Sequence, residues 1–474
     1  MSRIALCGVF DIPNYGDHLF PLVCRNELKR RGYQGEVVLF SPFEAQESFV
    51  ENSLVHSLDD LEHMHQQHPF DVIIVGGGEI IHWHRFGQKR DFSSTTFTQY
   101  PMDKVWMIPS FMKLKYGVPL LWNAPGIPFV FDSGADAAHM LINGVDYISV
   151  RNEFSANVLR DIDIDDAHIH LVPDTGFSLK SIASQQQLNA AKEEVFPELG
   201  RYAVFHCNRF IPEDAVADVV DTLNMVHDAG YHVVLLPLAY THGDEDALRS
   251  ISAALPFEAL LPNKPLSLLQ IIGILANCDL YIGTSLHGSV TASVFGKTIV
   301  SFDYQQTKKT KDLYHLLGFD DYYVTDVKLL KATAQNAMEH QHAFDFSNIQ
   351  SRIDSHFDAL YAFIDGERTA SPAPVPTSVE LSNMTQAYFE RQDQCSRLLQ
   401  RQHELEEALQ TNIDLVTLFK TRSESYAHDV EQLRQIIHEL QQQNEDLRRR
   451  VVRRPVRTYL SILESRIKSR KCVL

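Results

Sequence analysis

Short apolar runs alternate with amphipathic stretches along the first 345 residues of the chain. Nearly all of the runs end in a turn that contains Gly, Pro, Asn or Asp. This alternation is typical of parallel strands joined by crossover helices, and it predicts an α/β fold. The expected strands are Ile4–Val9, Glu36–Phe40, Asp71–Val75, Pro119–Asn123, Tyr147–Val150, His168–Val172, Tyr202–His206, Tyr231–Leu236, Phe257–Leu260, Asp279–Gly283 and Thr298–Phe302. The expected helices of the later part are Asp214–Asp228, Leu266–Ala276, His287–Phe295 and Ile349–Ile364.

The expected strands fall into two consecutive arrays. A polar, helix-prone stretch from Ser184 to Leu199 separates them. We therefore expect two Rossmann-like domains, residues 1–183 and 200–365, that face each other across a cleft. In such folds ligands bind at the carboxyl ends of the strands, so the residues directly after each strand are the candidates for chemistry.

The hydrophobic period changes in the last quarter of the chain. Residues 366–380 form a linker rich in Pro, Ser and Ala, and residues 388–452 then follow a seven-residue repeat. The two core columns of this repeat carry apolar residues at thirteen of seventeen positions. β-Branched residues such as Ile437 in one column, Leu in the other and a single Asn444 favour a parallel two-stranded coiled coil, and hence a dimer. The alternative is a helix that packs back on the globular part.

The chain ends in a basic segment. From Arg448 to Leu474 there are ten Lys and Arg against one acid, although the whole chain has a formal net charge of −18. Such an acidic chain argues against nucleic acid as a bulk electrostatic partner. The apolar residues of 453–474 are spaced as on an amphipathic helix. Two interpretations stay open: contact with an anionic membrane surface, or a solvated end.

Composition indicates the compartment. Hydrophobic residues make up 44% of the chain, which is ample for a packed core. Six scattered cysteines without a CxxC pair argue against a disulfide framework or a metal site and favour a reducing compartment. The first apolar run is too short for a signal peptide, and no stretch approaches the roughly 18 apolar residues of a membrane span. We expect a cytoplasmic protein, with the basic tail as a candidate peripheral contact at the inner face of the membrane.

Two candidate segments follow strands of the first array. In Asn14-Tyr15-Gly16-Asp17, Gly16 permits close approach to the backbone, and the free N–H groups of a helix start attract anions or polar groups. Asn14 and Asp17 are candidates to bond a sugar; the alternative is that Asp17 only caps the helix.

The second segment is Gly76-Gly77-Gly78-Glu79, a turn whose backbone can contact a ligand. Its spacing is not GxGxxG, which argues against a dinucleotide site. Glu79 is a candidate acid or base, with capping of the next segment as its alternative.

Arg151 directly follows a strand and opens a helix. A guanidinium at a helix start combines a planar donor fork with the partial positive charge of the helix, which suits a carboxylate or phosphate. The alternative is a salt bridge to Glu153 or Asp174. Asp174 follows the next strand toward the same edge, and Arg209 follows the first strand of the second array.

The most specific segment is Thr284-Ser285-Leu286-His287-Gly288, directly after a strand that ends at Gly283. Histidine transfers protons near neutral pH, and the N–H groups of a helix start can hold an anion beside it. This combination favours a functional role for His287 over a structural one. After the last strand, Lys308 and Lys309 bring cations toward the same cleft.

Taken in order over residues 3–325, these segments resemble the polysaccharide pyruvyl transferase family. The resemblance implies a GT-B-like fold and the transfer of pyruvate from phosphoenolpyruvate to a sugar of a surface polysaccharide or its precursor, as a cyclic ketal on two hydroxyls. The matching elements are Asn14-Tyr15-Gly16-Asp17, Gly76-Gly77-Gly78, Ser149-Val150-Arg151 with Ser155, Pro173-Asp174, Asp279 through Gly283-Thr284-Ser285-Leu286-His287-Gly288, and Tyr304 to Lys308 and Lys309 ahead of Leu316-Leu317-Gly318.

The resemblance also implies roles for single residues. Arg151 and His287 are linked to the donor, but many members carry Arg or Lys where this chain has Ser285. That departure shifts weight to Arg209, Lys308 and Lys309 for the second cationic contact.

We accordingly expect Arg151, with Arg209, to clamp phosphoenolpyruvate while His287 transfers a proton or contacts the phosphate. Asp17, Glu79 and Asp174 would orient or activate hydroxyls of the acceptor, a glycan or a lipid-linked sugar. Neither a cofactor nor a metal is expected. The other residues expected to bind substrate are Asn14, Gly16, Gly76, Gly77, Gly78, Thr284, Ser285, Leu286, Lys308 and Lys309.

Two other functions fit the same pattern. One is a GT-B glycosyltransferase that uses a nucleotide-sugar, although the second array offers no convincing acidic residue for the ribose. The other is a non-catalytic scaffold that recruits partners through the coiled coil. The presence of Arg151, His287 and the glycines argues against the scaffold.

Overall fold

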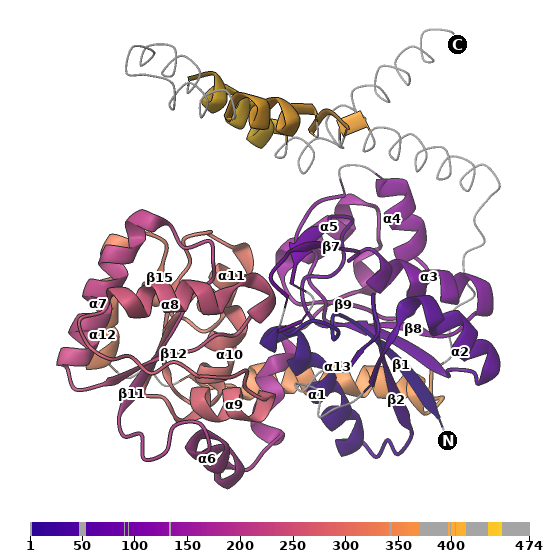
Figure 1. Ribbon diagram of the computed structural model, residues 1–474. Helices are drawn as coiled ribbons and strands as arrows, with labels where there is room; N and C mark the ends of the chain where they lie inside the picture. The colour runs from indigo at the N-terminus through magenta and orange to yellow at the C-terminus, as the bar shows by residue number, and fades with distance from the viewer. Residues whose placement is uncertain are drawn as a thin grey trace. The chain divides into compact units, whose positions relative to one another are not determined.

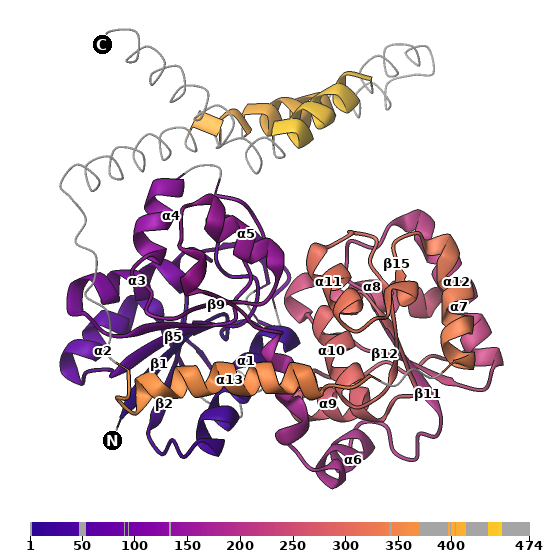
Figure 2. The ribbon, with the colours of Figure 1, turned by 180° about the vertical axis from the view of Figure 1, so that it is seen from behind.

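The computed structural model describes residues 2–46, 54–89, 91–92, 94–131, 134–340, 344–368, 397–398, 400–402, 404–413 and 435–447. One compact unit comprises residues 1–129 and 141–374, and it contains both large sheets. The expected α/β fold with parallel sheets is confirmed, and helices lie on both sides of each sheet (Figures 1 and 2). The boundaries of the two expected domains stay a prediction.

The first sheet has the strand order β3-β4-β2-β1-β5-β8, parallel except where β3 meets β4. Its central strands are buried on both faces, which explains their continuous apolar sequence. In register, Cys7 of β1 faces Phe40 of β2 on one side and Val75 of β5 on the other. The strands are β1 (Arg3–Cys7), β2 (Glu36–Ser41), β3 (Ala45–Gln46), β4 (Leu54–Ser57), β5 (Val72–Gly76) and β8 (Leu120–Asn123).

The second sheet is parallel throughout, in the order β12-β11-β13-β14-β15. In each sheet the order of the strands reverses direction once, and the reversal leaves a crevice at the carboxyl ends of the two strands concerned. We call the crevice between β1 and β5 of the first sheet the first switch point, and the crevice between β11 and β13 of the second sheet the second switch point. The strands are β11 (Tyr202–His206), β12 (His232–Leu235), β13 (Leu280–Gly283), β14 (Thr298–Phe302) and β15 (Tyr323–Val324).

Helices connect these strands, and two small sheets complete the unit. The small sheets are the antiparallel pair β6 (Phe86–Gln88) with β7 (Thr98–Tyr100) and the parallel pair β9 (Ile148–Val150) with β10 (Ile169–Leu171). The helices are α1 (Tyr15–Arg30), α2 (Leu61–Gln67), α3 (Lys104–Tyr116), α4 (Ala135–Ile142), α5 (Glu153–Asp161), α6 (Gln185–Glu193), α7 (Val216–Asp228), α8 (Asp244–Ala254), α9 (Leu268–Asn277), α10 (Leu286–Val294), α11 (Lys308–Leu316), α12 (Val327–Glu339) and α13 (Ser347–Ile364).

One expectation about the elements needs correction. The segment Phe257–Leu260 is not a strand: it contributes a single bridge from Leu260 to Val234, because it runs past the open edge of β12 for one residue only. The helix-prone stretch between the two arrays is a helix as expected, α6, and it packs against α9. A Cβ atom on Gly273 of α9 would lie only 2.5 Å from the Leu188 carbonyl oxygen of α6, so the two helices are in close backbone contact.

The C-terminal part is described only in pieces. Residues 404–413 and 435–447 are helical, and within them Leu405 and Asn444 are buried while Ile413 and Ile436 are exposed. Leu405 and Asn444 belong to the two core columns of the seven-residue repeat, and Ile413 and Ile436 do not, so burial follows the repeat. The coiled coil stays a prediction. Most of the linker, residues 369–380, and the basic tail, 453–474, lie outside the described residues.

Two surface observations concern the described residues. No helix among them combines the length and apolar content that crossing a membrane requires.

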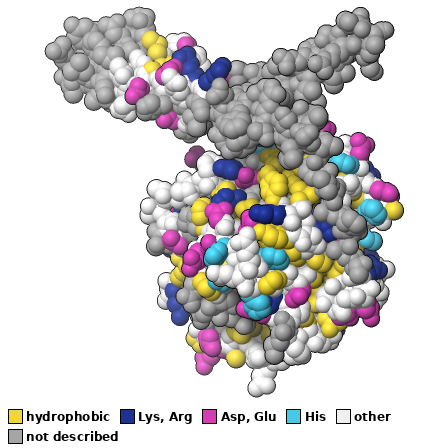
Figure 3. All heavy atoms as spheres, turned by 90° about the vertical axis from the view of Figure 1, so that its right-hand side faces the viewer, with side chains coloured by type: hydrophobic (Ala, Val, Ile, Leu, Met, Phe, Trp, Pro, Cys, Tyr) yellow, Lys and Arg dark blue, Asp and Glu magenta, His cyan; other side chains and the backbone are white. Residues whose placement is uncertain are grey.

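On the face drawn in Figure 3, basic, acidic and histidine side chains are interspersed with apolar ones, so neither sign of charge dominates that face.

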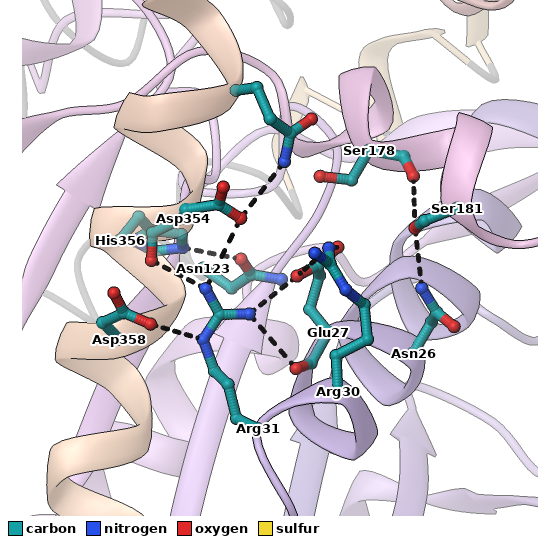
Figure 4. Close-up of polar contacts among 11 residues, drawn as sticks. Asn26, Glu27, Arg30, Arg31, Asn123, Ser178, Ser181, Asp354, His356 and Asp358 are labelled. Atoms are coloured by element: carbon teal, nitrogen blue, oxygen red, sulfur yellow. Dashed lines mark hydrogen bonds and ion pairs between the residues drawn. The ribbon is translucent and has the colours of Figure 1, made fainter. Parts of the chain in front are cut away.

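Helix α13 joins the two halves of the chain from behind, where it packs on α1 (Figure 2). Figure 4 shows the polar part of this contact, which centres on Arg31 at the end of α1. Its guanidinium pairs with the fully buried Glu27 at 2.7 Å, reaches Asp358 at 2.8 Å and donates to the Asp354 carbonyl oxygen at 2.8 Å. His356 extends the contact to the first sheet, where it bonds Asn123 at the end of β8 at 2.9 Å. The closing helix is therefore tied to a strand tip.

Arg31→Ala would remove the bridge between α1 and α13 and leave the buried Glu27 carboxylate with Arg30 alone. We expect the free energy of unfolding to fall by about 3 kcal/mol, the scale for breaking a buried ion pair. Arg30→Ala is the matched control, because it removes a 48% exposed partner of the same carboxylate while Arg31 continues to pair with Glu27. We expect this variant to lose about 1 kcal/mol or less, the scale for a largely solvated arginine. Urea unfolding measures both variants, and an equal loss in the two would contradict the role given to Arg31.

Candidate functional site

The first switch point begins with the N-terminus of α1. Asn14 is the N-cap residue, and its side chain accepts a hydrogen bond from the Gly16 N–H at 3.2 Å. Asp17 therefore lies in the first turn rather than at the cap. Its partly buried carboxylate is near the positive end of the helix, where a negative charge is stabilised. The capping alternative for Asp17 is thus wrong, and its side chain remains available for the crevice.

The glycine turn after β5 lies against this helix. Gly77 and Gly78 adopt φ angles of 92° and 77°, which side chains rarely tolerate. A Cβ atom on Gly77 would lie 2.2 Å from the Phe20 ring, and one on Gly78 would lie 2.7 Å from an Asp17 carboxylate oxygen. The turn therefore needs glycine for close approach as well as for backbone conformation. Gly76 is similarly restricted, since its Cβ would meet Asn123 at 2.5 Å.

Arg151 and Asp174 form the buried centre of the site. Arg151 follows β9, and its Nη1 donates to Asp174 Oδ2 at 3.2 Å while Nη2 lies 3.5 Å from Glu79 Oε1. The two side chains are only 4% and 8% exposed. Asp174 also caps a 3-10 helix, Thr175–Ser181, by accepting the Gly176 N–H at 2.9 Å. Of the salt-bridge alternatives for Arg151, Asp174 is realised, whereas Glu153 pairs with Arg160.

Two groups from the second half of the chain complete the cluster. His287 lies in the first turn of α10, and its Nε2 is 3.4 Å from Asp174 Oδ2. Lys309 lies in the first turn of α11, and its Nζ is 2.7 Å from Glu79 Oε2. A Cβ on Gly16 would lie 2.1 Å from His287 Nδ1, so the histidine ring rests directly on the start of α1. Residues that follow strands of both sheets thus meet in one cluster of charges.

A small cavity of about 50 Å³ opens beside this cluster. That volume holds only a few water molecules. Within the described part of the chain, Arg151 Nε is a buried atom without a hydrogen-bond partner, and the buried His287 Nε2 has only the long 3.4 Å contact to Asp174 Oδ2. Weakly paired buried N–H groups are costly, so both atoms are suited to bind an acceptor atom. The cavity is lined by Arg151, Asn152, Asp174, Phe177, Leu286, Lys309, Asp312, Leu313 and Leu316.

The three carboxylates of the site have different pKa values. Burial raises the pKa of Asp17 to about 6, and electrostatic interaction with His287, Lys309 and Arg151 offsets only part of that rise. Burial acts on Glu79 as well, but Lys309 and Arg151 outweigh it and lower its pKa to about 2. For Asp174, burial is likewise outweighed by His287 and Arg151, which hold its pKa well below the usual range. Asp17 is the one of the three that titrates near neutrality.

The structure does not bring every expected site residue into this cluster. The Lys308 ammonium lies 3.6 Å from the centre of the Phe154 ring. The Arg209 guanidinium lies 3.9 Å from the Phe97 ring and 4.5 Å from the Phe210 ring, and its Nη1 donates to the His242 carbonyl oxygen. Three candidate cations follow strands of the second sheet: Arg209, Lys308 and Lys309. Of these, Lys309 alone forms an ion pair with an acidic residue that follows the first sheet, Glu79.

The remaining candidates lie at the start of α10. Ser285 is the N-cap residue, and its Oγ accepts the Gly288 N–H at 3.2 Å. Thr284 faces His206 at the end of β11. His206 in turn contacts Asp244, which the sequence did not single out. Asp244 is followed by Glu245 and Asp246 at the start of α8, and three consecutive acids at a helix start are normally exposed. Its complete burial has no signal in the sequence.

A family model described as polysaccharide pyruvyl transferase matches residues 14–306, more than half of the chain. The chain belongs to the polysaccharide pyruvyl transferase family. The match spans the segments around Asn14, Gly76, Arg151 and His287, which the structure gathers at the facing strand tips. No curated protein matches the chain.

Solved structures share the fold of this family member. The UDP-GlcNAc 2-epimerase of Methanocaldococcus jannaschii has a TM-score of 0.53 at 10% identity, over 76% of this chain and 99% of that one. A putative UDP-N-acetylglucosamine 2-epimerase of Listeria monocytogenes has a TM-score of 0.51 at 10% identity, over 79% and 99%. The enzyme of Neisseria meningitidis bound to UDP-GlcNAc has a TM-score of 0.50 at 10% identity, over 77% and 100%. At this identity the likeness concerns the fold alone, which is GT-B-like.

Lys309→Met would remove one of the cations that oppose burial of the Asp17 carboxylate. We expect the pKa of Asp17 to rise above its value of about 6, so that Asp17 stays protonated to higher pH. Carbon-13 NMR of the Asp17 carboxyl resonance against pH measures the shift. Lys308→Met is the matched control, because the Lys308 ammonium lies over the Phe154 ring, and it should leave the titration unchanged.

Proposed function

We propose that this protein transfers pyruvate from phosphoenolpyruvate to a sugar and forms a cyclic ketal on two of its hydroxyls. The observation that carries the proposal is the convergence of Arg151, His287 and Lys309 on the carboxylates Asp174 and Glu79, beside a small cavity that Arg151 and Lys309 line. Phosphoenolpyruvate presents a carboxylate and a phosphate within three carbons. Such a ligand needs several fixed positive groups and N–H donors close together.

The donor would accept hydrogen bonds from N–H groups that are now weakly paired or unpaired, and it would replace Glu79 as the partner of Lys309. Arg151 Nε and His287 Nε2 offer buried N–H groups. Lys309 is 32% exposed and paired with Glu79, which is 26% exposed, so an entering anion can replace Glu79 as its partner. Glu79 is then free to accept a hydrogen bond from a hydroxyl of the acceptor.

Lys309 also offers an explanation for the presence of an uncharged residue, Ser285, where a cation is expected. The resemblance implies that many members of the family carry a cation at the place of Ser285, whose hydroxyl caps α10 in this chain. Lys309 reaches the acids of the first sheet from the neighbouring helix α11, which puts a cation in the same crevice. We therefore assign the second cationic contact to Lys309 rather than to Arg209 or Lys308.

The chemistry requires proton transfer in both directions. A proton adds to the enol carbon, the central carbon passes through an oxocarbenium-like state, a hydroxyl attacks it, and phosphate leaves. His287 would supply or stabilise the proton on the donor side. Asp17, with a pKa of about 6, is suited to accept a proton from an acceptor hydroxyl at neutral pH. Glu79 and Asp174 are held as weakly basic carboxylates, so they orient groups rather than exchange protons.

A GT-B glycosyltransferase that uses a nucleotide-sugar is the second candidate. The observation that favours it is the fold shared with UDP-GlcNAc 2-epimerases. The compact charge cluster favours the three-carbon donor, which carries a carboxylate and a phosphate. One assay separates the two, because it offers phosphoenolpyruvate or nucleotide-sugars together with galactoside, mannoside and glucoside acceptors.

With phosphoenolpyruvate we expect phosphate release and a pyruvyl mass gain on one acceptor. Arg151→Ala should lower kcat/KM by about 100-fold, the scale of losing charged hydrogen bonds of up to about 3 kcal/mol. Arg160→Ala, which changes a 38% exposed arginine on α5, is the control and should retain activity. Phosphate colorimetry and mass spectrometry give both readouts. Mass gain only from a nucleotide-sugar would contradict the proposal.

Self-association through the coiled coil belongs to the same proposal. The helical residues 435–447 carry Ile437 and Leu440 in the two core columns, and both are partly buried. Ile437→Asp combined with Leu440→Asp should make the full chain monomeric, because charges at core positions are desolvated in the dimer. Sedimentation against the exposed pair Gln441→Asp and Gln443→Asp tests this. Equal molecular masses for the two variants would contradict it.

A further inference from the structure

The second switch point holds a hydrogen-bonded chain that the proposed donor site does not use. His206 ends β11 and pairs in register with Gly283, the last residue of β13. Thr284 follows Gly283, and its Oγ1 lies 3.3 Å from His206 Nδ1. His206 Nε2 lies 2.8 Å from Asp244 Oδ2. A hydroxyl, an imidazole and a carboxylate thus follow one another across the crevice where ligands bind in folds of this class.

The direction of these hydrogen bonds follows from the surroundings of Asp244. Its Oδ2 also accepts the backbone N–H groups of Leu238 at 3.1 Å and Ala239 at 2.6 Å. A carboxylate only accepts, so His206 Nε2 carries the proton. His206 Nδ1 is then the acceptor in the neutral ring, and the Thr284 hydroxyl donates to it. The oxygen of Thr284 keeps its lone pairs for another donor.

Burial orders the chain from the core to the crevice. Asp244 is fully buried, His206 is 3% exposed, and Thr284 is only partly buried. A ligand can therefore reach the hydroxyl but not the two groups behind it. A buried carboxylate costs several kcal/mol in desolvation unless it is paired. Hydrogen bonds from His206 and from two backbone N–H groups compensate Asp244 in part, and a proton added at His206 Nδ1 would make the ring a positively charged partner for it.

Ketal formation needs such a site. Two acceptor hydroxyls each lose a proton: one balances the proton added to the enol carbon, and the other balances the proton carried by the released phosphate. Asp17 serves one hydroxyl. Glu79 and Asp174 are poor bases because their cationic partners stabilise the ionised forms. The second hydroxyl needs another base.

We propose that Thr284 accepts a proton from an acceptor hydroxyl and passes its own proton to His206 Nδ1, with Asp244 as the positioning residue. The O–H bond of the sugar breaks as its oxygen bonds to the central carbon of the donor. A new O–H bond forms on Thr284, and the resulting imidazolium of His206 is stabilised by Asp244. The proton then returns from His206 Nδ1 through the Thr284 hydroxyl to the phosphate as the bond between the central carbon and the phosphate oxygen breaks. This inference rests on the proposed function and names the base for one acceptor hydroxyl.

The test compares Thr284→Val with Thr284→Ser in the full chain. Valine keeps the shape and removes the relay, so kcat for transfer to the glycoside acceptor should fall by about 10²–10⁴-fold, the range of general-base catalysis. The KM for phosphoenolpyruvate and the thermal shift that it induces should stay unchanged. Serine restores the hydroxyl and should restore most of kcat. Thr222→Val, which changes a buried hydroxyl within α7, is the matched control.

A second measurement concerns Asp244. In nitrogen-15 NMR the neutral ring of His206 should carry its proton on Nε2, and Asp244→Asn should shift the tautomer toward Nδ1 and lower kcat. Wild-type kcat in Thr284→Val, or a wild-type His206 ring protonated on Nδ1, would overturn the relay while leaving the proposed function intact. A wild-type protein that neither binds phosphoenolpyruvate nor releases phosphate from it would overturn the proposed function itself, and the relay with it.

Discussion

The site depends on placing a guanidinium and a carboxylate side by side out of water. Arg151 and Asp174 are 4% and 8% exposed, and either one alone would be a buried charge without compensation. The pair is incomplete by itself, since Asp174 also faces His287 and Arg151 also faces Glu79. Arg151 and Asp174 are therefore each stabilised by further residues, Glu79 and His287, that follow other strands. Removing one would change the protonation and the orientation of the rest, so these charges act as a single unit.

Packing, rather than charge, sets the distance between the two switch points. Tyr15 at the start of α1 is fully buried, and its hydroxyl lies 2.7 Å from Thr291 Oγ1 of α10. These two helices carry Asp17 and His287, so their contact fixes how far the glycine turn lies from the histidine. Helix α13 reinforces the arrangement from behind through Arg31 and its partners. Apolar packing and hydrogen bonds between helices thus hold the charge cluster together.

Much of this could be predicted from the sequence, because strand tips are marked by local composition. Gly76 to Gly78, Arg151 and His287 each follow an apolar run, and parallel strands bring such positions to one edge. Partners chosen by tertiary packing could not be predicted. Lys308 and Lys309 are adjacent in sequence, yet consecutive helical residues point about 100° apart, and only the phase of α11 decides which reaches Glu79. The Arg209 guanidinium lies over the ring of Phe97, between β6 and β7. These two strands have only three residues each, too few for a periodic pattern, so this contact could not be predicted.

The capping role of Ser285 has a consequence for how the charge cluster can be altered. An arginine at this position would add a charge to the crevice but would remove the oxygen that accepts the Gly288 N–H, a loss of about 1 kcal/mol of helix stability. Because Lys309 supplies its positive charge from α11, position 285 can keep the serine that caps α10.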